Sequence, residues 1–401
     1  MATEEEMDVK ERFKYLRMMK RRYEKVDRKT KGRLLDEMEA ITGLHRKHLI
    51  VRMNESGPYR RKRKRERSRY YGEDVEEAIA IIADTLDWIC AERLKPGLPQ
   101  MAKQLAAFGE MEVDEELLQK LERISISTVR RIVQRVQPEG PRLPRARRGR
   151  RSDSAAQMLV PVSVIPWDEP SPGHFEVDLV HHSRSDVEGD FICTIQCIDV
   201  LTGWSERFAI KGHTFGVMWR AFQTFDRHCP LPVREVHSDN GSEFINASLI
   251  GYFGEHLVHI KQTRGEPGIK NHNRFVEQKN SSLVRAYFTD LYLHTSEHLE
   301  LMNDIYTDMW LYYNFFQPVL RQTERKVVQR PNGTYSVRRK QDEAKTPLDR
   351  LLAAKPPISK ETRLRLQKLR AETNPRALKR SIHQKLDEIY QLAEEDERRK
   401  A

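Results

Sequence analysis

Apolar residues recur at helical spacing in the first third of the chain and in strand-like runs after it. From residue 10 to 140 they return every three or four positions, which predicts mostly helices. Residues 31–54 carry two apolar stripes on either side of Gly43, a pattern typical of a helix-turn-helix. The stripes consist of Leu34, Leu35, Met38 and Ile41, and then of Leu44, Leu49, Ile50 and Met53.

Residues 73–136 form a second helical unit that ends in ISISTVRRIVQRV. Ser127 is the expected N-cap of its last helix, because a serine hydroxyl can accept a free amide of the first turn. This unit is open to two interpretations, a second helix-turn-helix or an ordinary helical hairpin.

After a segment rich in Pro and Arg, short apolar runs separated by turns predict strands. We expect strands in residues 173–183, 231–239 and 257–263, and a two-stranded hairpin in 190–212 that turns at Leu201-Thr202-Gly203. Helices are expected in residues 214–229, 241–256, 273–288 and 296–316. This order of elements favours the ribonuclease H-like fold, a mixed five-stranded sheet flanked by helices.

The C-terminal region is expected to begin with a basic β-hairpin, because two alternating segments flank Asn332-Gly333. Helices follow. The last one has Ile382, Leu386, Ile389 and Leu392 at helical spacing, which suits docking either on the core or on a second subunit.

The predicted organisation is therefore multidomain, with helical N-terminal domains, an α/β core, and a small hairpin plus helices at the C-terminus. The expected segments are a helix-turn-helix domain (1–57), a basic linker (58–72), a second helical domain of helix-turn-helix type (73–138), a Pro/Arg-rich basic linker (139–166), the ribonuclease H-like core (167–318), the basic hairpin segment (319–355) and the C-terminal helices (356–401).

Charge narrows the choice of partner. The formal net charge is +11 and the excess is clustered, which favours a polyanion such as DNA over a solvated surface. Residues 59–70 carry eight Lys or Arg and one Glu, and residues 141–152 carry six Arg and no acid. Solvated linkers and solvated helix faces are the alternative interpretation. The candidate DNA contacts from these regions are His45, Arg46, Lys47, Arg52, Arg61, Arg63, Lys64, Arg130, Arg131, Arg147, Arg148 and Arg150.

The four cysteines show no zinc-type spacing, the N-terminal residues are acidic, and no apolar run approaches the roughly 18 residues of a membrane span. We therefore expect a reduced, cytoplasmic protein without a signal peptide or a membrane partner.

Three carboxylates fall where this fold would bring them together. Asp178 lies in the strand FEVDLV, Asp239 ends the strand of VREVHSDNGSEF, and Glu277 lies in the first turns of a helix. Converging acids repel each other, and a divalent cation removes that cost. Two Mg²⁺ or Mn²⁺ ions at such a site assist in-line displacement at phosphorus. The alternative for Asp239 is a structural one, capping of the following helix.

Four motifs, FEVDLVHHS, DVLTGWSE, VHSDNGSEF and KNHNRFVEQKN, resemble the integrase catalytic core of DDE transposases from bacterial insertion sequences. That core is shared with retroviral integrases, and the likeness is greatest to the ISNCY-like type, which has helix-turn-helix units in front of the core. The resemblance implies that Asp178, Asp239 and Glu277 are the catalytic, metal-binding triad.

The resemblance further implies metal-dependent cleavage at transposon ends followed by strand transfer into target DNA. The partners would be double-stranded DNA and further copies of the chain assembled on it, in a bacterial, nucleoid-associated setting. Residues near the triad that could contact DNA are Asn240, Asn273, Arg274 and Asn280. The chain departs from its relatives at His272, where Asp is expected.

Two other functions remain open from the sequence. One is a sequence-specific DNA-binding regulator with a silent core, and the other is a ribonuclease H-like nuclease without strand transfer. Histidines 181, 182 and 237 are expected to support the site by hydrogen bonding, and Trp204 is expected to pack in the core rather than to stack on a base.

Overall fold

A computed structural model describes residues 9–54, 70–138, 171–182, 191–212, 214–238, 244, 253–264, 276, 279–288, 291–329 and 335–400. The chain divides into two compact units, Met1–Tyr70 and Tyr71–Ala401. Among the described residues, no helix combines the length and the apolar composition needed to cross a membrane.

The first unit is a three-helix cluster of α1 (Val9–Tyr23), α2 (Arg28–Thr42) and α3 (Arg46–Asn54). Its core includes Leu16, Leu35, Met38, Leu49 and Met53. α1 falls within the region predicted to be mostly helical but was not predicted as a separate helix, although Leu16, Met19 and Tyr23 mark its buried face.

The turn between α2 and α3 contains Gly43 in the left-handed region (φ 68°), where glycine ends a helix without strain. The predicted break at this residue is confirmed. Ile41 and Ile50, however, are 43% and 38% exposed and do not belong to the buried stripes. At both positions the tertiary packing, and not the spacing, decides which residue is buried.

The second unit opens with a helical region, and most of its helices are short. They are α4 (Glu73–Thr85), α5 (Ala91–Leu94), a 3₁₀ turn (Lys95–Gly97), α6 (Leu98–Ala107), α7 (Glu115–Arg123) and α8 (Ile126–Val136). The prediction of Ser127 as the cap of the last helix was wrong. α8 begins two residues earlier, and the Ser125 side chain accepts the amide of Thr128.

The central sheet is mixed and has the strand order β3-β2-β1-β4-β5. Its strands are β1 (His174–His181), β2 (Ile192–Asp199), β3 (Ser205–Lys211), β4 (Glu235–Ser238) and β5 (Lys261–Arg264). The first three pair antiparallel, and β4 runs parallel to both β1 and β5. This confirms the predicted five-stranded mixed sheet.

The hairpin between β2 and β3 turns where the sequence predicted. The buried carboxylate of Asp199 accepts hydrogen bonds from the backbone amide and the hydroxyl of Thr202 and from the amide of Gly173. It therefore ties the hairpin turn to the residue just before β1. Gly203 has φ 76°, a conformation that favours glycine.

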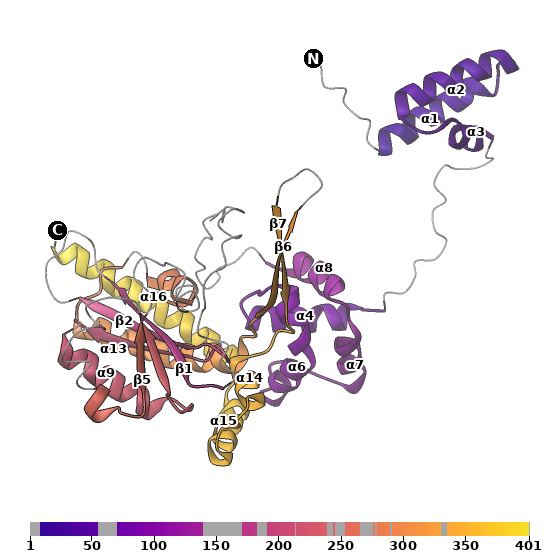
Figure 1. Ribbon diagram of the computed structural model, residues 1–401. Helices are drawn as coiled ribbons and strands as arrows, with labels where there is room; N and C mark the ends of the chain where they lie inside the picture. Colours follow the sequence, from indigo (N-terminus) through magenta and orange to yellow (C-terminus); the bar gives the residue numbers. More distant parts are fainter. Residues whose placement is uncertain are drawn as a thin grey trace. The chain divides into compact units, whose positions relative to one another are not determined.

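Helices cover both faces of the sheet (Figure 1). α9 (Phe215–His228) packs on the face that carries Phe175, whose ring meets that of Phe225 edge-on at 4.9 Å. α13 (Ser296–Leu311), continued by a π-helical turn (Tyr312–Phe316), covers the opposite face. There the Tyr306 hydroxyl lies 2.6 Å from that of Thr194. The helix predicted for residues 241–256 lies largely outside the described residues.

The C-terminal region contains two antiparallel strands where a hairpin was predicted, β6 (Gln322–Gln329) and β7 (Tyr335–Gln341). Asn332-Gly333, the predicted turn, lies outside the described residues. Three helices follow, α14 (Pro347–Ala353), α15 (Lys360–Glu372) and α16 (Pro375–Lys400). α16 packs on α13 (Figure 1). The Asp308 carboxylate of α13 accepts a hydrogen bond from the Ser381 hydroxyl and forms an ion pair with Lys385. The last helix therefore docks on the core of its own chain.

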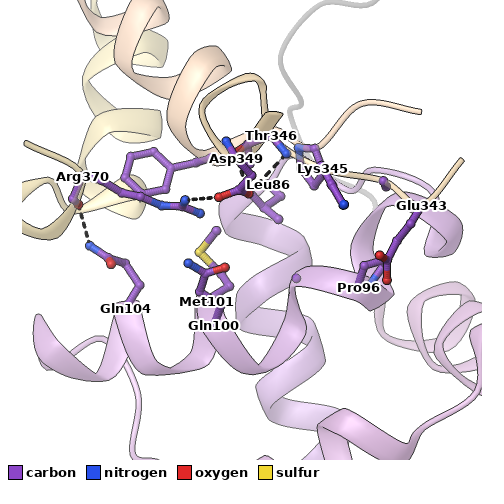
Figure 2. A pocket seen from close by; sticks show the side chains of 14 residues that line it. Leu86, Pro96, Gln100, Met101, Gln104, Glu343, Lys345, Thr346, Asp349 and Arg370 are labelled. Atoms are coloured by element: carbon purple, nitrogen blue, oxygen red, sulfur yellow. Dashed lines mark hydrogen bonds and ion pairs between the residues drawn. The ribbon is translucent and has the colours of Figure 1, made fainter. Parts of the chain in front are cut away.

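The helical region contacts the end of α13 and the segment after it. The Tyr312 hydroxyl donates to the carbonyl of Thr85 at 2.8 Å, and the Gln317 amide donates to the carbonyl of Leu86 at 3.0 Å. A pocket of about 270 Å³ lies beside these contacts. Figure 2 shows Gln104 at its edge donating to the carbonyl of Arg370, whose guanidinium pairs with Asp349.

A buried carboxylate in β3 makes the fold sensitive to pH. Glu206 accepts hydrogen bonds from the indole nitrogens of Trp204 and Trp310 at 2.7 and 2.9 Å. Burial nevertheless raises the pKa of Glu206 to about 7, because the charged form loses its hydration.

We expect stability to fall as the pH rises from about 4.5 to about 7, since the folded state holds the Glu206 proton more tightly than the unfolded state. The loss is on the order of 3 kcal/mol from this group. Glu206→Gln should flatten the profile in denaturant titrations across this range. Glu255→Gln, at a carboxylate whose side chain is 78% exposed, is the control and should leave the profile unchanged. Equal slopes for Glu206→Gln and wild type would contradict the assignment.

Candidate active site

The candidate site starts from two carboxylates on β1. Glu176 and Asp178 are two residues apart, so both side chains leave the strand on the same face, the one that α13 covers. Glu176 is fully buried and Asp178 is partly exposed. The parallel register pairs Glu176 with His237 of β4, which places the end of β4 beside this part of β1.

Asp178 is held by two hydrogen bonds. Its Oδ2 accepts the side-chain amide of Asn280 at 2.6 Å, and its Oδ1 accepts the amide of Leu179 at 2.9 Å. Asn280 is 2% exposed and begins a π-helical turn, Asn280–Arg285. Such turns are rare and often occur at functional sites.

Asp239 and Glu277 lie outside the described residues, but their neighbours in sequence do not. Ser238 ends β4. Val276 donates its amide to Oε2 of Glu176 at 2.9 Å, and Asn280 reaches Asp178. Val276 and Asn280, which flank Glu277, therefore contact β1, and His237, two residues before Asp239, pairs with it.

Oxygen donors of this kind fit a hard divalent cation. Asp178 is partly exposed, and a carboxylate oxygen can accept more than one contact. Asp178 could hold Mg²⁺ or Mn²⁺; Asp239 and Glu277, the other two predicted ligands, lie outside the described residues.

A row of polar side chains crosses the sheet from Asp178. The register pairs Asp178 with Gln196 of β2, and Gln196 with Arg207 of β3, so all three share one face. Arg207 is 5% exposed, and its guanidinium lies over the rings of Tyr306 and Tyr313 at 5.9 and 5.5 Å. The sequence analysis missed Arg207, although a charged residue in the apolar run SERFAIK was a usable signal.

A lysine two residues after Glu277 has a perturbed titration. Burial, reinforced by the charges of Arg93, Arg207 and Arg321, lowers the pKa of Lys279 to about 7.

Comparison with known proteins gives a relative of similar length. An uncharacterized protein, y4rM, of Sinorhizobium fredii is 32% identical over 310 residues, which cover 76% of this chain and 86% of that protein. The chain belongs to the y4rM family. No protein-family model matches it.

Two solved structures are similar to this y4rM family member over part of its length. One is a chain of the simian T-cell lymphotropic virus intasome in complex with PP2A regulatory subunit B56 gamma, with 15% identity, 55% of this chain and 70% of that chain covered, and a TM-score of 0.30. The other is the catalytic core domain of BIV integrase, with 18% identity, 35% and 83% covered, and a TM-score of 0.25.

Asn280 was predicted to contact DNA, but its burial against Asp178 favours a positioning role. We expect Asn280→Ala to lower the rate of any reaction that depends on Asp178 by about 10- to 100-fold, the range seen when a partner of a metal ligand is lost. In the same assay, the metal concentration that gives half of the maximal rate should rise.

A control for this prediction is Asn303→Ala, which removes an amide of α13 that bonds to Ala209 and Leu299 and not to β1. An Asn280→Ala protein with the wild-type rate and metal dependence would show that the contact has no role in positioning Asp178.

The three histidines near the strands differ in environment. His181 is exposed, whereas His182 is buried with its Nε2 2.7 Å from the Thr194 hydroxyl, and burial lowers the pKa of His182 to about 4. Nδ1 of His237 lies 3.0 Å from the Thr263 hydroxyl. His182 and His237 support the fold around the site in this y4rM family member. Trp204 is fully buried, as predicted.

The candidate DNA contacts of the first unit lie around α3. His45 and Lys47 are exposed, and Nδ1 of His45 accepts the amide of Lys47. Arg46 is engaged within its own unit, where it contacts Asp36 and the carbonyl of Gly32. Arg52, predicted to face outward, is only partly exposed, with its guanidinium 5.9 Å from the centre of the Phe13 ring.

In the second helical region, Arg130 pairs with Glu92, and Arg131 contacts Ser127 and Thr128 of its own helix. Both arginines remain exposed. The other candidates lie outside the described residues: Arg61, Arg63, Lys64, Arg147, Arg148, Arg150, Asn240, Asn273 and Arg274. Their contact with DNA stays a prediction.

Proposed function

We propose that this chain is an insertion-sequence transposase that binds terminal inverted repeats and catalyses metal-dependent end cleavage and strand transfer. The observation that carries the proposal is the pair of contacts that joins residues 276 and 280 to β1, at Glu176 and Asp178. These contacts bring the residues around Glu277 to the strand that carries the first acid. The parallel pairing of β1 with β4 brings His237, two residues before Asp239, beside Glu176.

In this proposal Asp178, Asp239 and Glu277 hold two Mg²⁺ or Mn²⁺ ions, which would activate an attacking oxygen and stabilise the leaving oxygen at phosphorus. The protein's own contribution is geometric. Asn280 fixes the orientation of the Asp178 carboxylate, and Glu176 secures the backbone at Val276. A carboxylate held in one orientation loses less entropy when its ligand binds.

The basic regions would bind the DNA backbone and position the transposon ends. Exposed His45 and Lys47 on the first unit and Arg130 and Arg131 on the second are suited to phosphate contacts. Because two ends react together, we propose that the chain assembles as an oligomer on DNA. Binding should weaken steeply with salt, as expected when many cations release counterions.

A DNA-binding regulator with a silent core is the alternative from another functional class. A regulator has no need of an ordered carboxylate, yet Asp178 is held by a buried amide at 2.6 Å. This contact favours an enzyme. A nuclease without strand transfer would share the site, and only the products of the reaction separate it from a transposase.

The test is a cleavage and joining assay on duplex DNA that carries the inverted repeats flanking the gene, with Mg²⁺ or Mn²⁺ and with EDTA. We expect nicks at the repeat ends and joined products with metal, and neither with EDTA. Nicks without joined products would favour the nuclease, and tight binding without any cleavage would favour the regulator.

A further inference from the structure

Two histidines and an aspartate come together where α13 begins and α16 nears its end. His294 precedes α13, His298 lies in its first turn, and Asp396 lies four residues before the end of α16. Each side chain offers one ligand atom, and these three atoms lie within 4.8 Å of one another. None of these residues is part of the candidate active site.

The three side chains are held in place by their surroundings. His298 is fully buried, and the other two are partly buried. The His294 ring stacks on that of Tyr292, with centroids 4.6 Å apart and planes 13° from parallel. Thr295 caps α13 through the amide of His298, which fixes the start of the helix. Two ligands thus come from one rigid turn and the third from a packed helix.

The separation of His298 and Asp396 suits two ligands of one metal ion better than it suits a direct hydrogen bond between them. Nε2 of His298 lies 4.0 Å from Oδ2 of Asp396, beyond the range of a hydrogen bond. Two atoms bound tetrahedrally to zinc at about 2.0–2.1 Å are roughly 3.3 Å apart. Shortening the Nε2–Oδ2 distance by less than about 1 Å would therefore bring these two atoms to the separation of two zinc ligands. Oδ1 of Asp396 faces Arg399 at 3.9 Å, and Oδ2 faces the histidine.

Acidic residues are numerous near the three residues, although Arg399 lies 3.9 Å from Asp396 and 3.8 Å from Glu395. A groove of about 750 Å³ runs between α13 and α16, and no Lys or Arg is among its lining residues. Its acidic residues are Glu297, Glu300, Asp304, Glu388 and Glu395. Acids gathered in one groove raise the local concentration of cations.

We propose that His294, His298 and Asp396 bind a transition-metal ion of the zinc class, which links the start of α13 to the end of α16. Imidazole nitrogens suit Zn²⁺ and similar ions, whereas Mg²⁺ prefers oxygen ligands and water. The fourth position would be taken by water. This site is independent of the proposed transposase activity, because it uses different residues and a different class of metal.

The protonation of His298 is compatible with this site. Its Nδ1 accepts the amides of Thr295 and His294 at 3.4 and 3.5 Å. Both contacts are long for hydrogen bonds and therefore weak. Metal binding at Nε2 moves the ring proton to Nδ1, so a neutral histidine stays neutral. The amides of His294 and Thr295 then face an N–H donor and need other acceptors, a cost that the metal–ligand bonds have to exceed.

The test uses the full-length chain with Asp178→Asn, in excess Mg²⁺, so that the carboxylates of the active site do not report. Zn²⁺ is titrated by calorimetry, and Co²⁺ is followed by its visible absorption. We expect one Zn²⁺ per chain at this site and a tetrahedral Co²⁺ spectrum that Zn²⁺ removes. Asp396→Asn and His294→Asn should each weaken Zn²⁺ binding at least about tenfold. Loss of a residue that hydrogen-bonds a metal ligand already weakens metal binding by about that much, and loss of the ligand itself should weaken it further.

The matched controls are Glu394→Gln, an exposed acid two residues from Asp396, and His259→Asn, a histidine that pairs with Asp226. Both should bind Zn²⁺ as the parent does. His294 and Asp396 are only partly buried, so their variants should fold, which circular dichroism checks. The proposal is overturned if the Asp178→Asn parent binds no Zn²⁺, or if the His294→Asn and Asp396→Asn variants bind Zn²⁺ as tightly as the parent does.

Discussion

Asp178→Asn is expected to reduce DNA cleavage and strand joining by at least about a thousandfold. A bound metal supplies several kcal/mol of transition-state stabilisation, and about 4 kcal/mol corresponds to roughly a thousandfold in rate. The substitution keeps the size of the side chain and an oxygen that can accept from Asn280, so the fold around β1 should persist. What it removes is the negative charge that a metal ion requires.

The measurement is the initial rate of nicking under saturating Mn²⁺, with DNA binding measured in parallel. Asp226→Asn, the same chemical change at a carboxylate of α9 that pairs with His259, is the matched control and should retain the wild-type rate. Binding should be unchanged in both variants. If Asp178→Asn cuts DNA at the wild-type rate, Asp178 is not part of the catalytic site, and the proposed mechanism fails with it.

The largest loss of stability is expected from Trp204→Ala, at about 3–5 kcal/mol, the usual cost of removing a buried aromatic side chain. Trp204 is fully buried, meets the Trp310 ring edge-on at 5.4 Å, and donates its indole N–H to Glu206. Truncation therefore removes packing between β3 and α13 and also leaves the buried carboxylate with one donor fewer.

Denaturant titration followed by circular dichroism measures this loss without relying on tryptophan fluorescence. Trp204→Phe separates the two contributions, because it keeps a ring and removes the N–H; we expect about 1–3 kcal/mol for it. Val258→Ala, at a residue that is 74% exposed, should change stability by less than about 0.5 kcal/mol. Equal midpoints for Trp204→Ala and wild type would show that this contact does not stabilise the core.

Local sequence patterns were sufficient for several parts of the fold. Short apolar runs predicted β1 to β3, and the Leu201-Thr202-Gly203 turn was correctly placed because a tight turn depends on a few adjacent residues. Helical spacing predicted α9 and α13 within one or two residues at their starts. The cap of α8 was misplaced because Ser125 and Ser127 are both acceptable caps, and only the path of the chain chooses between them.

By itself, the sequence determined the succession of the five strands of the sheet, the position of Asp178 within a strand, and the clustering of positive charge, because each depends on neighbours along the chain. Only the tertiary structure decided that Asn280 is buried against Asp178, that Gln196 and Arg207 continue a polar row across the sheet, and that α16 docks on its own core. These contacts join residues far apart in sequence. Their formation depends on strand register and side-chain packing, neither of which a local pattern specifies.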